Sequence, residues 1–92
     1  MNDNEPSVTL ITGRAARRKD GPFEGVHIML VATDDDTAVK LALQALTREG
    51  YASAELDRIG DMEGMPEEEP HASAYQGAVE GEVAIVTFEE PF

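Results

Sequence analysis

Few side chains of the types that perform catalysis occur in this chain. It contains two histidines, His27 and His71, and no cysteine. No serine stands in a Gly-x-Ser-x-Gly turn, and the glycine spacings of phosphate-binding loops are missing. A histidine inside an apolar stretch, as His27 is, serves more often for packing than as a base or a ligand. The sequence therefore predicts no catalytic residue and no cofactor, and it leaves open whether the protein is an enzyme.

Two acidic clusters are the candidates for a metal site, and each has a simpler explanation. Asp34–Asp36 are consecutive, so on a helix their side chains point about 100° apart, and capping of a helix accounts for them. Asp57, Asp61 and Glu63 resemble a calcium-binding loop only in part, because Met62 stands where such a loop needs glycine. We predict no metal site.

Acidic residues outnumber basic ones. Seven Lys and Arg against nineteen Asp and Glu give the 92 residues a net charge of -12. This charge disfavours binding to nucleic acid and to anionic membranes, and it favours solubility, divalent cations or a basic partner. A solvated acidic surface with no special role explains the charge equally simply. No apolar run is long enough to span a membrane. Together with the absence of cysteine and the polar, acidic first residues, these features predict a small, soluble, cytoplasmic protein.

Four of the seven cations lie close together, at Arg14, Arg17, Arg18 and Lys19. One hypothesis is that the three arginines contact a small anion or an acidic peptide. The alternative is that they protect an edge strand against pairing with another sheet and are attracted to the protein's own acidic surface. The cluster is not typical of a nucleic-acid site, because no aromatic residues are interleaved with it.

The apolar pattern predicts one α+β domain over residues 7–92, after a disordered tail at residues 1–6. Strands are expected at about 7–17, 23–33, 51–59 and 82–89, with an Asp-Gly turn between the first two. A main helix follows the second strand, and a short second helix begins near Pro70. Between the third strand and this short helix, residues 60–70 are expected to form an exposed acidic loop.

The main helix carries sequence signals at both ends. Thr33 or Asp34 is suited to the N-cap, where a side-chain oxygen accepts a backbone N–H bond. Arg48 lies in the last turn, where a cation suits the helix dipole. Gly50, followed by Tyr51, predicts a Schellman ending.

Hydrophobicity on both faces predicts which strands are central. The strands at 23–33 and 82–89 are apolar on both faces, which is typical of strands covered on both sides. The strand at 51–59 alternates cleanly and is expected at an edge. Together with the first hairpin, this pattern predicts an antiparallel sheet of order 1-2-4-3 with the chain order ββαβ(α)β. That order resembles a variant of the ferredoxin-like fold, which by itself implies no function.

The sheet face opposite the main helix is the expected functional surface. A short second helix that contains glycine would leave apolar side chains exposed there, and such a surface is normally an interface. The expected interface residues are Met29, Val31, Val86 and Phe88. The expected ligand-binding residues on the same face are His27, Met29 and Tyr75. If the second helix does cover this face, we expect a monomer instead.

Three functions remain open. The first is a non-enzymatic binding or assembly module that forms a homodimer through its sheet. The second is an acidic antagonist, of an immunity-like or nucleic-acid-mimicking kind, that masks a basic protein. The third is a small enzyme or ligand-binding protein with a pocket near His27.

Overall fold

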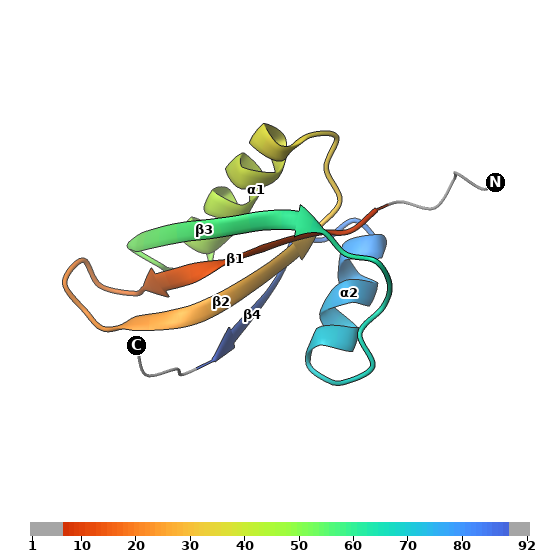
Figure 1. Ribbon diagram of the computed structural model, residues 1–92. Helices are drawn as coiled ribbons and strands as arrows, with labels where there is room; N and C mark the ends of the chain where they lie inside the picture. Colours follow the sequence, from red (N-terminus) through yellow and green to blue (C-terminus); the bar gives the residue numbers. More distant parts are fainter. Residues whose placement is uncertain (1–6, 89–92) are drawn as a thin grey trace.

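A computed structural model describes residues 7–88 (Figure 1). Its elements in chain order are β1 (Thr9–Ala16), β2 (Phe23–Leu30), α1 (Asp35–Arg48), β3 (Ser53–Asp61), α2 (His71–Val79) and β4 (Ala84–Phe88). The four strands form one antiparallel sheet, which confirms the predicted α+β class. The tail expected at residues 1–6 and the end of the fourth predicted strand at Glu89 lie outside the described residues.

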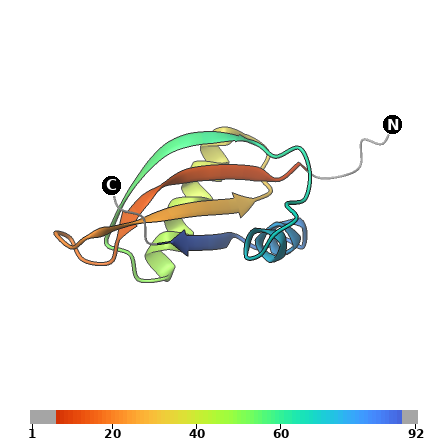
Figure 2. The ribbon, with the colours of Figure 1, turned by 60° about the horizontal axis from the view of Figure 1, so that its bottom comes forward.

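The strands lie side by side in the order β3-β1-β2-β4, so the predicted order 1-2-4-3 is wrong (Figure 2). β2 is central and β3 is an edge strand, as predicted. β1 and β4 have exchanged the expected places. The β1–β2 hairpin forms the middle of the sheet, β3 pairs with β1, and β4 pairs with β2.

β4 is apolar on both faces although it lies at the edge, because its two faces contact two different core clusters. Ile85 packs into the cluster beneath α1, and Val86 packs into the cluster beneath α2. The two apolar faces of β4 therefore reflect contact with both core clusters and do not indicate how many strands lie beside it.

β1 occupies the centre because its backbone comes close to both neighbours. Ala15 and Ala16 are fully buried, and a Cβ on Gly13 would lie 2.2 Å from the backbone oxygen of Glu55. A register shift lies beside this glycine, where Gly13 is paired with Leu56 and Thr12 with Arg58. The small residues of β1 thus allow β3 to pair closely with it. A hydrophobicity pattern gives little sign of this, because small residues contribute little to it.

α1 begins and ends where its sequence predicts. The side chain of Asp34 accepts a hydrogen bond of 2.8 Å from the backbone N–H of Thr37, which makes it the N-cap. At the other end, Gly50 has φ +98° and its N–H bonds to Thr47, while the N–H of Tyr51 bonds to the oxygen of Leu46. These two bonds are those of the predicted Schellman ending.

The two helices cover opposite faces of the sheet (Figures 1 and 2). α1 packs on the face formed by Ile11, Val26 and Ile28, where the larger core cluster lies. α2 packs on Met29 and Val86 of the opposite face, with three buried alanines along its length. The ferredoxin-like arrangement predicted together with the wrong strand order is not confirmed.

Candidate functional site

The sheet face that carries α2, here called the second face, is only partly covered. α2 packs mainly on β2 and β4 at one end of the sheet. Toward β1 and β3 the second face is hollowed by two adjoining grooves, which share Leu10 and His27 in their linings. One groove lies over β1 and β3, and the other lies between the sheet and the loop that leads to α2. We call the two together the His27 groove.

The two histidines of the chain meet in this groove. Nδ1 of His27, in the middle of β2, lies 2.9 Å from Nε2 of His71, the first residue of α2. The two rings meet edge to face with centroids 5.1 Å apart, and Phe88 contacts the His27 ring in the same manner at 4.8 Å. Both histidines are half-buried. A hydrogen bond between two imidazoles requires one donor and one acceptor, so at least one ring is neutral when this contact forms.

The start of α2 is held in place by its own loop. Hydrogen bonds from the side chain and the backbone N–H of Ser73 lower the pKa of Glu69 below its ordinary value of 4.5. Glu69 therefore replaces the side-chain cap that Pro70 cannot supply at the first turn. This geometry fixes His71 above β2.

The walls of the His27 groove are acidic. Asp57 and Asp61 line the part over β1 and β3, where Arg58 is the single cation among the lining residues within 7–88. Glu67–Glu69 line the part beside α2. The floor is apolar and includes the half-buried Leu10 and the loop residue Met62. The groove can therefore bind a group that is cationic at its end and apolar along its length.

The predicted ligand-binding and interface residues divide between the groove and the core. His27 and Met29 both line the groove. Met29 is fully buried, however, and Val86 is 7% exposed, since both pack in the cluster beneath α2. In the single chain these two side chains are therefore buried beneath α2, and the binding and interface roles expected for the predicted residues stay predictions. Tyr75 is half-buried against the same core cluster, Phe88 lies against the His27 ring, and Val31 is exposed beyond the end of β2.

The three arginines predicted to bind an anion do not converge. Arg14 lies on the second face, where Nη2 and Nε donate to Glu55 at 2.6 and 2.9 Å and the guanidinium lies over Phe23. Arg17 follows the last residue of β1 and lies beside the end of α1, where it contacts Glu49. Arg18 lies in the hairpin turn, where its backbone oxygen accepts from Gly21.

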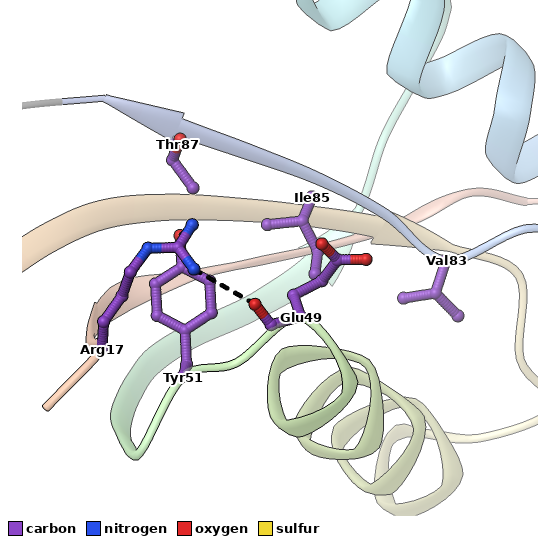
Figure 3. A pocket seen from close by; sticks show the side chains of 6 residues that line it. All are labelled: Arg17, Glu49, Tyr51, Val83, Ile85 and Thr87. Carbon is purple, nitrogen blue, oxygen red and sulfur yellow. Dashed lines mark hydrogen bonds between the residues drawn. The ribbon is translucent and has the colours of Figure 1, made fainter.

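Arg17 lines a separate hollow of about 280 Å³ between the end of α1 and β4 (Figure 3). Its guanidinium lies over the Tyr51 ring and donates to the backbone oxygen of Glu49 and to the Tyr51 hydroxyl. That hydroxyl donates in turn to Glu24 at 3.1 Å. Burial, assisted by Glu24, raises the pKa of Tyr51 above 10.0. These contacts fasten the end of α1 to the sheet, so we assign the hollow a structural role.

Metal binding by carboxylates alone has no support in residues 7–88. Asp34 is the N-cap and Asp57 accepts a hydrogen bond from Thr12. Among the described residues, no three or more side chains of His, Cys, Asp or Glu are arranged to hold an ion. Within the same residues, no helix has the length and apolarity needed to cross a bilayer.

Comparisons with known proteins add no assignment. No family model, no curated protein and no solved structure matches the chain. Sequence reasoning treated His27 and His71 separately, since they are 44 positions apart. One sequence signal could have joined them. His27 belongs to the sheet face on which the second helix was expected, and His71 lies at the start of that helix.

Proposed function

We propose that this protein is a non-enzymatic binding module that holds a basic segment of a partner protein in the His27 groove. The observation that carries the proposal is the lining of the groove, where five carboxylates and one arginine surround an apolar floor. Long basic side chains suit such a surface, because their stems pack on apolar groups while their charged ends reach carboxylates.

The charge of the whole chain supports the same partner. A net charge of -12 attracts cationic proteins from a distance and repels nucleic acid. Steering of this kind raises the association rate and is screened by salt. The acidic-antagonist hypothesis is thereby favoured over a dimer formed through the second face, because α2 covers the apolar side chains which that dimer needs.

Fluorescence anisotropy with a labelled Lys- and Arg-rich peptide tests the proposal. The wild-type protein should bind it with an affinity that falls as salt rises, and an Asp- and Glu-rich peptide should not bind. The double variant E67K/E68K should lose binding, because it reverses two charges in the groove wall. The matched control is D20K/E80K, which changes the net charge equally at exposed positions outside the groove. Equal losses in both variants would show that net charge alone attracts the peptide and would refute the groove.

A second candidate function, self-association through the sheet, is favoured by the edge strand β4. The edge strand β3 carries charged residues and an irregular register, which are devices that prevent edge-to-edge pairing. Within Ala84–Phe88, β4 carries no charged side chain. We propose that a dimer, if it forms, pairs two β4 strands.

Light scattering after size-exclusion chromatography tests this dimer. The mass should double at high protein concentration, and T87K should restore the monomer by placing a cation on the β4 edge. T47K, on the exposed side of α1, is the matched control. Salt should strengthen the dimer, because it screens the repulsion between two acidic chains. A monomer at high micromolar concentration in high salt would refute it.

A further inference from the structure

We propose that His27 and His71 together form a binding site for a divalent transition-metal ion, with Cu²⁺ and Ni²⁺ preferred over Zn²⁺. The inference is independent of the basic partner proposed above. It begins from two imidazole nitrogens, Nδ1 of His27 and Nε2 of His71, that face each other at 2.9 Å. Imidazole is a ligand suited to these three ions, and the general order of affinity places Cu²⁺ first.

The distance between the nitrogens fits two neighbouring positions around one ion. Metal–nitrogen bonds are about 2.0–2.1 Å long. If the two nitrogens stay 2.9 Å apart, the nitrogen–metal–nitrogen angle at an ion bound to both is about 90°. Square-planar and octahedral ions, which include Cu²⁺ and Ni²⁺, require that angle between neighbouring ligands. A tetrahedral Zn²⁺ requires the nitrogens to move apart to about 3.3–3.4 Å.

The ring positions allow the exchange of a proton for an ion. In the present contact one facing nitrogen donates a hydrogen bond to the other, and the rings meet edge to face at an interplanar angle of 64°. When an ion binds both facing nitrogens, a neutral donor ring carries this proton on its other nitrogen instead, and an imidazolium ring releases it to water. At a nitrogen–metal–nitrogen angle of about 90°, each metal–nitrogen bond makes an angle of about 45° with the line that joins the nitrogens, so each ring has to turn by about that angle to point its lone pair at the ion. His27 is held by a central strand and His71 by the first turn of α2, so the two ligands come from elements whose separation is already fixed.

The surroundings favour a divalent cation. Glu67–Glu69 line the groove on the side of His71, and Asp57 and Asp61 line it on the side of β3. These carboxylates lower the electrostatic energy of a dication and can hydrogen-bond to its bound waters. Since no third described side chain completes a ligand set, water fills the remaining positions. The site is therefore exchangeable and open to a further ligand.

Copper titration of the full-length, untagged protein tests this proposal. The chain contains two histidines in total, so pulsed electron paramagnetic resonance can count every imidazole bound to Cu²⁺. We expect one ion per chain with two imidazole ligands. The variants H27Q, H71Q and H27Q/H71Q should all lack the copper species with two imidazole ligands. The double variant also measures background binding by the amino terminus. E67Q/E68Q should weaken binding by about tenfold while keeping both imidazoles.

Several outcomes would overturn the site. The proposal is wrong if H71Q binds copper as tightly as the wild type does. It is also wrong if the wild-type spectrum shows only one imidazole bound to copper. Because His27 lies within the sheet, H27Q can unfold the protein, and circular dichroism identifies that case. The result then depends on H71Q, whose substitution lies at the start of α2. Failure of peptide binding with intact copper binding would refute only the basic partner.

Discussion

At the scale of single residues, two glycines allow close approach to the central strands. A Cβ on Gly13 would lie 2.2 Å from the Glu55 oxygen and 2.7 Å from the Leu56 Cα, both of which are backbone atoms of β3. A Cβ on Gly25 would lie 2.6 Å from the ring of Phe88. A side chain can rotate away, whereas a paired strand cannot move without losing hydrogen bonds. Position 25 should therefore tolerate an added methyl group better than position 13.

We predict that G13A lowers the free energy of unfolding by about 2 kcal/mol or more, within or above the range for overpacked cores. G25A should cost less, because Phe88 can shift. Urea denaturation of both variants measures the difference. The prediction is wrong if G13A is as stable as the wild type, or if the order of the two variants is reversed.

Asp34 links stability to pH. Hydrogen bonds from Thr37, the backbone N–H first, lower the pKa of Asp34 below its ordinary value of 3.8. A lowered folded-state pKa means that the cap stabilises the fold fully above pH 3.8 and loses this effect as the pH falls through the folded-state value. D34A should therefore melt below the wild type at pH 7, and the gap should shrink below pH 3.8. D20A, in the exposed hairpin turn, should show no such gap, and a gap in D34A that is independent of pH would contradict the linkage.

At the scale of elements, α2 depends on small side chains for its place on the sheet. Its buried residues are Ala72, Ala74 and Ala78, of which Ala78 is fully buried. Alanines let the helix axis approach Met29 and Val86 closely, and this approach brings His71 within reach of His27. The intrinsic helix propensity of the α2 sequence is weak, since it contains Gly77. Packing rather than local preference therefore holds this helix.

A larger residue at the helix–sheet contact should displace α2. We predict that A78L lowers the free energy of unfolding by about 1–3 kcal/mol and weakens copper binding by separating the histidines. V79L, at an exposed position in the last turn of α2, is the control and should change stability by less than about 0.5 kcal/mol. Chemical denaturation and copper titration of both variants measure this. Unchanged stability in A78L would show that α2 is not packed as described.

At the scale of the whole molecule, charge opposes compactness. A net charge of -12 on 92 residues produces self-repulsion that the fold must overcome. Few compensating contacts exist among the described residues, where Arg14–Glu55 is the one ion pair found and both partners are substantially exposed. Acidic carboxylates also surround the His27 groove from two sides. Binding of a cation there would relieve part of this repulsion.

Salt should stabilise this protein. The screening length falls from about 30 Å at 0.01 M to about 8 Å at 0.15 M ionic strength, so the melting temperature should rise over that range. Sodium chloride titration monitored by circular dichroism measures it. A melting temperature that falls with added salt would mean that attractive charge pairs outweigh the repulsion.

The sequence by itself determined what is encoded locally. The ends of α1 follow from Asp34, Arg48 and Gly50, because caps act within one helical turn. The hairpin, the start of the second helix near Pro70 and the acidic loop were likewise placed by short-range patterns, although packing is needed to hold α2 and β3 begins two residues later than the expected Tyr51. These features require only neighbours in the chain.

Tertiary structure alone decided the strand order and the site. β4 is apolar on both faces because its faces contact two different core clusters, and no pattern within β4 distinguishes this environment from a central position. The place of β1 depends on how closely β3 approaches Gly13, and the histidine pair depends on where α2 packs. Contacts between distant segments arise from the packing of the whole chain, so the periodicity of each segment could not reveal them.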